Sequence, residues 1–152
     1  MRDIRITGFA AGFLALGLLF SRGAFGDDSP SAPPSRNADF GRGAQAIKSK
    51  NWDEAVKYLD SATRAEPANA DAQNLLGYAY RNQRKFDLAF KHYGEALRLD
   101  PKHKGAHEYI GEAYVLVGDK AKAQEHLAAL DRICGRGCEE YQDLAKAIAQ
   151  TK

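Results

Sequence analysis

The stretch LLGYAYRNQRKFDLAFKHYGEALRLDP, residues 75–101, contains two runs whose apolar residues recur at helical spacing. Pro101 follows Arg98, Leu99 and Asp100 and ends the second run, because proline disfavours a helical residue before it. Gly77 and Ala89 are small residues at matching places in the two runs, where a larger side chain would wedge two packed helices apart. The stretch therefore predicts a pair of packed helices.

The same pattern recurs along the chain at a fixed interval. Pro67 and Pro101 are 34 residues apart, and other residues keep that interval. They form the series Gly43, Gly77, Gly111; Trp52, Phe86, Lys120; Ala55, Ala89, Ala123; and Ala62, Ala96, Leu130. A constant 34-residue period with two helices per unit is typical of a repeat solenoid.

The middle unit resembles the tetratricopeptide repeat (TPR) family. The matching residues are Leu76, Gly77, Tyr80, Phe86, Ala89, Tyr93, Ala96 and Pro101. The first unit has Ala46 where the middle unit has Tyr80, and the third unit lacks a closing proline. The resemblance implies an all-α solenoid of three TPR helix-turn-helix repeats, at about 36–69, 70–103 and 104–134, plus a C-terminal capping helix.

The expected layout has seven helices, near 38–49, 53–65, 70–82, 86–98, 104–117, 120–132 and 139–150. The last helix would cap the apolar end of the solenoid. Its apolar residues Tyr141, Leu144, Ala145 and Ile148 share one stripe. We expect that stripe to pack on the helix that carries Leu127 and Leu130.

The N-terminus has the composition of a secretory signal peptide. Arg2 and Arg5 precede an apolar run at 6–20, and Ala24 and Gly26 are spaced like a cleavage site. We expect residues 1–26 to be a signal peptide cleaved near Gly26, residues 27–37 a flexible linker rich in Pro and Ser, and residues 38–150 the TPR domain. The alternative is a leader that is retained as an anchor. A cleaved leader predicts a periplasmic or secreted protein.

Charge gives no indication of a nucleic-acid partner. The chain has 22 Lys and Arg against 20 Asp and Glu, and the leader removes Arg2, Arg5, Arg22 and Asp3, which leaves 19 of each. A neutral mature domain has no electrostatic attraction for nucleic acid or an anionic membrane. No later segment is apolar for long enough to span a membrane, so we expect no span in the mature form.

Cys134 and Cys138 are the only cysteines and lie on either side of Gly135 and Gly137. In an oxidising compartment paired thiols form disulfides, and the glycines allow the loop to close, so a structural disulfide is the favoured interpretation. A thiol-redox pair, a metal site and free thiols remain as alternatives. Redox pairs more often show Cys-x-x-Cys beside strands, and a metal would need further ligands.

The sequence contains no motif that indicates catalysis or a cofactor. There is no G-x-S-x-G, phosphate loop or H-E-x-x-H motif. His103 and His107 have i, i+4 spacing but no acidic partner that would complete a metal set, so we expect His92, His103, His107 and His126 to be surface residues. The sequence thus predicts no enzyme, no cofactor and no metal site.

The resemblance to TPR proteins implies protein or peptide binding on the concave face, which the first helices of the units line. We predict contacts from six residues: Asn74, Tyr78, Arg81, Asn82, Glu108 and Glu112. Some family members bind a C-terminal carboxylate with lysine and asparagine. Phe40 and Ala44 occupy those places in the first unit, so this mode is rejected.

The leading hypothesis is a non-catalytic adaptor or scaffold that is exported and binds a protein or peptide partner. One alternative is a thiol-redox protein that uses Cys134 and Cys138. Another is a self-assembling oligomer that stacks through its end surfaces. A monomer is favoured, because a capping helix would cover one end of the array.

Overall fold

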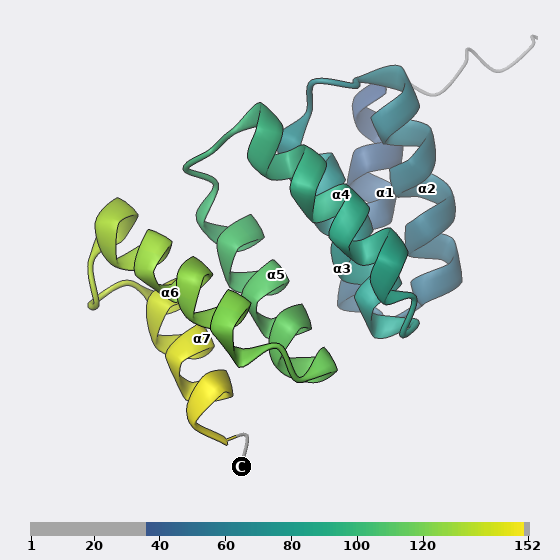
Figure 1. Cartoon of the computed structure of the whole chain (residues 1–152). Coiled ribbons are helices and arrows are strands. Elements are labelled where there is room, and N and C mark those ends of the chain that lie inside the picture. Colours follow the sequence, from purple (N-terminus) through teal and green to yellow (C-terminus); the bar gives the residue numbers. More distant parts are fainter. Residues whose placement is uncertain (1–35, 151–152) are drawn as a thin grey trace, which may run out of the picture. The chain divides into compact units, whose positions relative to one another are not determined.

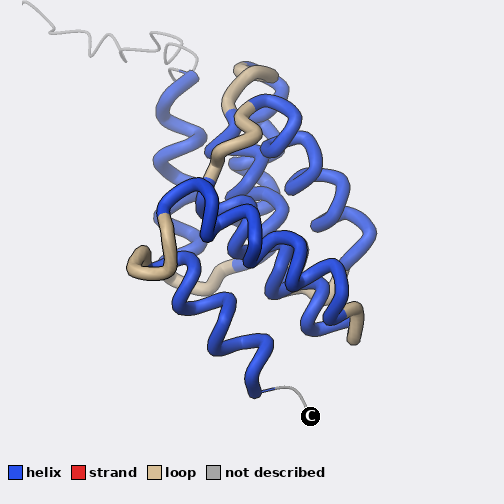
Figure 2. The backbone as a smooth tube through the Cα atoms, turned by 60° about the vertical axis from the view of Figure 1, so that its left-hand side comes forward, coloured by secondary structure: helices blue, strands red, loops and turns tan. Residues whose placement is uncertain are grey.

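The computed structural model describes residues 36–150, and the predicted leader and most of the linker lie outside them. The described part is all α-helix with loops and contains no strand, which confirms the predicted fold class (Figures 1 and 2). The helices are α1 (Arg36–Lys48), α2 (Trp52–Ala65), α3 (Ala70–Asn82), α4 (Phe86–Leu99), α5 (Lys104–Val117), α6 (Lys120–Cys134) and α7 (Glu139–Gln150). Helix α1 begins two residues before residue 38, the expected start of the repeat domain.

Short polar side chains begin several of the helices. The side-chain oxygens of Asn51, Asn69 and Asp119 accept hydrogen bonds from backbone N–H groups three residues ahead, at the starts of α2, α3 and α6. Such caps satisfy N–H groups that have no partner within the helix. Gly118 ends α5 with a positive φ of 86°, a conformation that glycine adopts without strain. The turns between the helices are thus encoded locally.

The helices form antiparallel pairs that stack along the chain. Within each unit α1 packs on α2, α3 on α4 and α5 on α6, and between units α2 packs on α3 and α4 on α5. Contacts also join α1 to α3, α3 to α5 and α5 to α7, so these four helices form one layer. That layer forms the face on which the predicted contact residues are placed.

In the first and second units, a glycine of the first helix lies against a buried side chain of the second helix. A Cβ atom at Gly77 would lie 2.8 Å from the ring of Tyr93, which is fully buried in α4. A Cβ at Gly43 would lie 2.5 Å from the side chain of Leu59 in α2. The expectation that Gly77 is small because two helices cross there is therefore confirmed.

Helix α7 packs differently from the expectation. We expected its apolar stripe on the helix that carries Leu127 and Leu130, which is α6. Instead α7 contacts both α5 and α6, and Leu144 is fully buried against Gly111 of α5. The reason is geometric. Helix α7 continues the layer of α1, α3 and α5, so it packs on α5, the preceding helix of that layer, as well as on α6.

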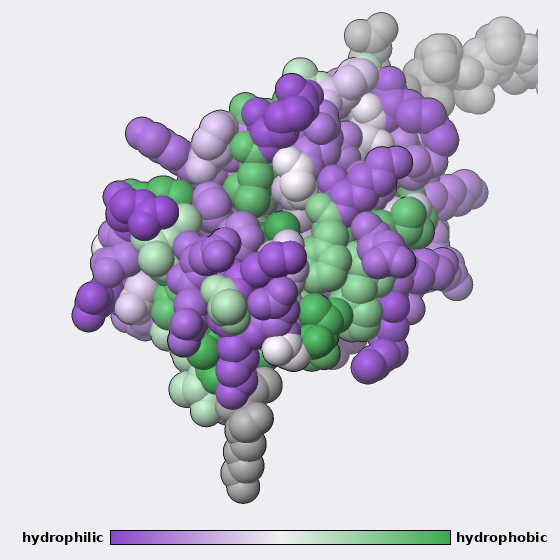
Figure 3. All heavy atoms as spheres, in the orientation of Figure 1, coloured by the Kyte–Doolittle hydropathy of each residue, from purple (hydrophilic) through white to green (hydrophobic). Residues whose placement is uncertain are grey.

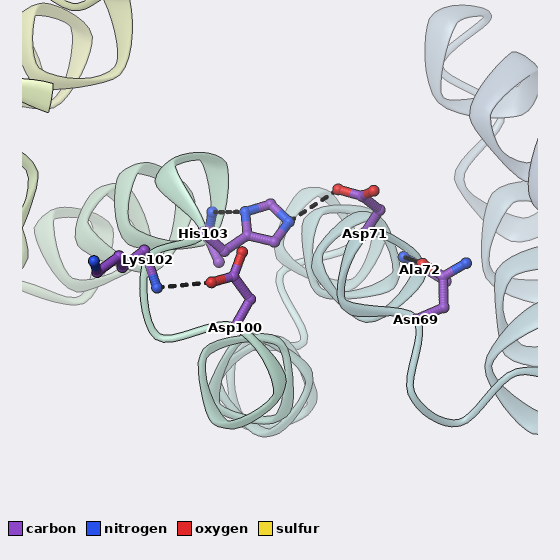
Figure 4. A network of polar contacts seen from close by, with 7 residues as sticks. Asn69, Asp71, Ala72, Asp100, Lys102 and His103 are labelled. Carbon is purple, nitrogen blue, oxygen red and sulfur yellow. Dashed lines mark hydrogen bonds and ion pairs between the residues drawn. The ribbon is translucent and has the colours of Figure 1, made fainter. Parts of the chain in front are cut away.

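A polar network joins the second unit to the third (Figure 4). His103 Nε2 lies 3.1 Å from a carboxylate oxygen of Asp71 in α3, and its Nδ1 accepts a hydrogen bond from the Ala106 N–H at the start of α5. Asp100 accepts from the backbone N–H of Lys102 in the same connection. The side chain of His103 therefore both begins α5 and links it to α3.

Among residues 36–150, no helix has the length and apolar character needed to cross a membrane.

Candidate functional site

A row of aromatic rings runs across the three units. Trp52 at the start of α2 lies edge-on to Tyr78 of α3, with ring centroids 6.1 Å apart. Tyr78 in turn contacts Tyr109 of α5, with centroids 4.8 Å apart. The rings are half-buried, so they offer both an apolar surface and a polar edge.

Arg81 is fixed against this row by several contacts. Its guanidinium carbon lies 4.8 Å from the Tyr78 ring centroid and 5.4 Å from that of Tyr109. It donates a hydrogen bond to the Tyr109 carbonyl oxygen at 3.2 Å and forms an ion pair with Glu112 of α5. The Arg81 side chain is only 10% exposed, so this cation is held rigidly between α3 and α5.

A cavity of about 380 Å³ opens beside the Arg81–Glu112 pair. Its lining comes from three helices: Arg81 and Asn82 of α3; Glu112, Val115 and Leu116 of α5; Ala147 and Gln150 of α7. We call this cavity together with the rings of Tyr78 and Tyr109 the groove. Leu116 is 59% exposed, so the groove contains apolar surface that water covers in the free protein.

Acidic residues of α5 and α7 lie close to one another beside the Arg81–Glu112 pair of the groove. Burial, and then the carboxylates of Glu112, Asp143 and Glu140, raise the pKa of Glu108 to about 8. Two of these carboxylates are paired with cations: Glu112 with Arg81, and Glu140 with Lys104 at 2.7 Å. The carboxyl group of Glu108 has no hydrogen bond or ion pair with any residue in 36–150.

The structure brings together most of the predicted contact residues. Tyr78, Arg81 and Glu112 contact one another directly or through Tyr109, and Asn82 lines the cavity. Asn74 differs from the other five, since it is only 5% exposed and its side-chain oxygen has no partner within the described chain. It lies between helices, beside Gly105 of α5, rather than on an open surface.

Sequence reasoning missed Trp52 and Tyr109 as part of this site. Both were absent from the predicted set, although Tyr109 and Glu112 are three residues apart and therefore share a helix face. That spacing was a signal that could have identified Tyr109. Trp52 gave no such signal, because only the stacking of α2 on α3 places it beside Tyr78.

The prediction that the histidines are surface residues is wrong. All four are partly buried and have partners. His92 contacts Gln73 at 2.8 Å and stacks on Tyr80, and His107 lies with its Nδ1 atom 2.9 Å from that of His126. These side chains join neighbouring helices, a role that the spacing of histidines along the sequence does not reveal.

Cys134 and Cys138 lie at disulfide-bonding distance at the joint between α6 and α7, with their sulfur atoms 2.09 Å apart. A carboxylate oxygen of Glu140 lies within 4.8 Å of both sulfur atoms. Sulfur atoms that are bonded to each other are not thiolates and so do not bind a metal as thiolates do. Glu140 is also paired with Lys104.

The family model described as tetratricopeptide repeat matches residues 40–102 and 78–136. No curated protein sequence matches the chain significantly.

Solved structures with this fold include several repeat domains. The chain is 29% identical to MamA 41-end from Desulfovibrio magneticus RS-1, with a TM-score of 0.64 over 66% of this chain and 57% of that one. The chain thus spans little more than half the length of that MamA chain. The TPR2B domain of yeast Sti1, in a complex with pHsp70, gives a TM-score of 0.69 at 20% identity over 77% of this chain and 98% of that one. The first TPR of Spaghetti (RPAP3), bound to the HSP90 peptide SRMEEVD, gives 0.69 at 19% identity over 76% and 90%.

Proposed function

Because this chain belongs to the tetratricopeptide repeat family, we propose that it is a non-catalytic scaffold that binds a peptide or protein segment in the groove. The observation that carries this proposal is that rigidly held contact groups and accessible apolar surface lie together in the groove. The tyrosine rings and Arg81 are held rigid by one another, while Leu116 and the cavity beside it stay accessible. Pre-ordered contact groups lower the entropy cost of binding an extended chain.

Two proteins of the same fold support peptide binding as the use of such a surface. The yeast Sti1 domain is seen in a complex with pHsp70, and the RPAP3 domain is seen with an HSP90 peptide. These two domains are only 20% and 19% identical to this chain, so the chemistry of its partner has to be inferred from the residues of its own groove. We take the partner to be a protein segment of different sequence.

The proposal includes export to the periplasm or the cell exterior as a monomer. The signal-like sequence of residues 1–26 supports export, and the cysteine pair at bonding distance fits an oxidising compartment. Mass spectrometry of the protein recovered from the periplasm or the medium tests this part. A mature chain that begins near Asp27 and carries an oxidised cysteine pair is expected, and a chain that stays in the cytoplasm with its leader contradicts it.

Binding is tested with a library of peptides about nine residues long, or roughly 30 Å when extended. The peptides carry blocked ends, so that no terminal charge takes part. The purified protein is compared with two variants, Leu116→Glu and Leu88→Glu. Leu116 lines the groove, whereas Leu88 is an exposed leucine of α4 outside it, at 39% exposure, so both variants place the same charge on an exposed site.

We expect the protein to retain a subset of the library. Leu116→Glu should reduce that retention at least about tenfold, since a charge in the apolar wall disfavours burial of the peptide. Leu88→Glu should leave retention unchanged. A folded protein that retains no peptide, or a loss that is equal in both variants, would contradict the proposal.

A further inference from the structure

We propose that the partner segment places a cationic side chain, a lysine or an arginine, beside Glu108 on the α5–α7 side of the groove. This inference rests on the proposed function and specifies the chemistry of its partner. Three features of residues 36–150 lie in this region: the carboxyl group of Glu108, which has no cation, the nearby tyrosine rings, and the buried side-chain oxygens of Asn74 and Tyr93, which have no donors. Each of these three observations favours a ligand that carries positive charge and N–H donors.

The first observation is the charge balance around Glu108. The carboxylates of Glu112, Asp143 and Glu140 act on it together, and Arg81 is the cation that opposes them. Arg81 is already held by Glu112 and by the Tyr109 carbonyl oxygen, and Lys104 pairs with Glu140. The site thus contains two carboxyl groups, those of Glu108 and Asp143, that these cations do not pair with, and a bound cation would lower the free energy of the charged form of Glu108.

The second observation is the position of the aromatic rings. Tyr109 is the residue next to Glu108, and its ring contacts that of Tyr78. These two rings already hold the Arg81 guanidinium at cation–π distance. A lysine or arginine beside Glu108 would meet the same pair of attractions, a carboxylate and the face of a ring.

The third observation is independent of the carboxylates. Asn74 of α3 and Tyr93 of α4 are almost wholly buried between helices, and the oxygen of each side chain lacks a hydrogen-bond partner within the described chain. Asn74 lies beside Gly105, one turn before Glu108, and the Tyr93 hydroxyl is close enough to Arg81, Glu112 and Tyr109 to interact with them electrostatically. Buried acceptors without partners are costly, and ammonium and guanidinium groups bring several donors.

An anionic ligand fits this region poorly. A carboxylate or phosphate group would approach the carboxylates of Glu112 and Asp143, which carry the same charge. The Nη1 group of Arg81 already donates to Glu112 and to the Tyr109 carbonyl oxygen. Like charges at close range disfavour such a partner, so the groove discriminates by repulsion as well as by attraction.

The test uses pools of blocked peptides, about nine residues long, in which one position is fixed as Lys, Arg, Gln or Glu. We expect the Lys or Arg pools to bind at least about tenfold more tightly than the Glu pools at one or more positions. Glu108→Gln should reduce this preference to less than about threefold while the Gln pools still bind. Glu125→Gln removes the same charge from an exposed site on α6 and should keep the preference.

The outcomes separate this inference from the proposed function. If Gln pools bind and Leu116→Glu blocks them, but Glu pools bind as well as Lys pools, the scaffold proposal stands and the cationic preference is overturned. Retention of the full preference in Glu108→Gln overturns the assignment to that residue. If no pool binds to the folded protein, both proposals fail. Circular dichroism of each variant establishes that it is folded.

Discussion

At the scale of single residues, the absence of a side chain decides how two helices meet. Gly77 of α3 faces Tyr93 of α4, whose ring occupies the space that a methyl group would need. Gly94, in α4, is exposed and has nothing within 4 Å of its Cβ direction. The same residue type therefore has opposite consequences for stability at these two positions.

We predict that Gly77→Ala lowers the free energy of unfolding by about 1–3 kcal/mol, because the added methyl overlaps a ring that is fully buried and cannot move aside. Gly94→Ala should raise it by about 0.5–1 kcal/mol, through the helix propensity of alanine alone. Chemical denaturation of both variants measures the difference. An equal effect of the two substitutions would contradict the close packing at Gly77.

At the scale of helices, a pair of histidines joins α5 to α6. The Nε2 atom of His107 lies 3.1 Å from the Pro101 carbonyl oxygen, which only accepts, so Nε2 carries the proton and Nδ1 accepts from His126. His126 also stacks on Tyr114, with centroids 5.8 Å apart. This arrangement requires the His107 ring to be neutral and His126 to carry a proton on Nδ1.

The pair makes stability depend on pH. Burial, and then the neighbouring His107, lowers the pKa of His126 to about 4, and burial also lowers that of His107. The unfolded chain, with histidine pKa values near 6.5, binds more protons between about pH 6.5 and 4, so stability falls as pH falls through this window.

We therefore predict that the wild-type protein loses about 1 kcal/mol of unfolding free energy from this pair across that window, after allowance for solvent screening. His126→Phe keeps a ring against Tyr114 but removes the titrating group, and its stability should fall less over the same range. Urea denaturation at several pH values measures both. Parallel pH profiles of the two proteins would show that His126 titrates normally.

At the scale of the whole described chain, stability comes from contacts between neighbouring units. Each helix packs on the helices next to it in the stack, and the core residues form local groups rather than one centre. The face seen in Figure 3 is mostly hydrophilic with scattered hydrophobic patches, as expected when apolar faces are buried between helices. In such arrays a destabilising substitution mainly affects the unit that contains it and the units next to it.

Two matched substitutions test this locality. Leu59 of α2 and Leu144 of α7 are both fully buried, and each fills the space at a helix glycine. Leu59→Ala and Leu144→Ala should each cost about 2–5 kcal/mol. Amide exchange should quicken in α1 to α3 for the first variant and in α5 to α7 for the second. Uniform acceleration across the described helices in both variants would show a single cooperative core instead.

The repeat itself could be predicted because its constraints are local and periodic. Glycine, alanine, aromatic and proline positions recur every 34 residues, and each has a packing or termination role that one unit displays by itself. The helix bounds and the all-α class followed from this. For the candidate site, the helix spacing of Tyr78, Arg81 and Asn82 placed them on one face of α3, and Glu108 and Glu112 on one face of α5.

The sequence alone determined which segments are helical, where they turn and that they pair in constant units, because those properties depend on residues close together in the chain. Tertiary structure decided the rest: that Arg81 pairs with Glu112, that Asn74 is buried, that the histidines meet and that Leu144 fills the space at Gly111. These outcomes depend on side chains from different helices, whose relative rotation and depth are set only when the units stack. Charge pairing and burial are properties of that stacking.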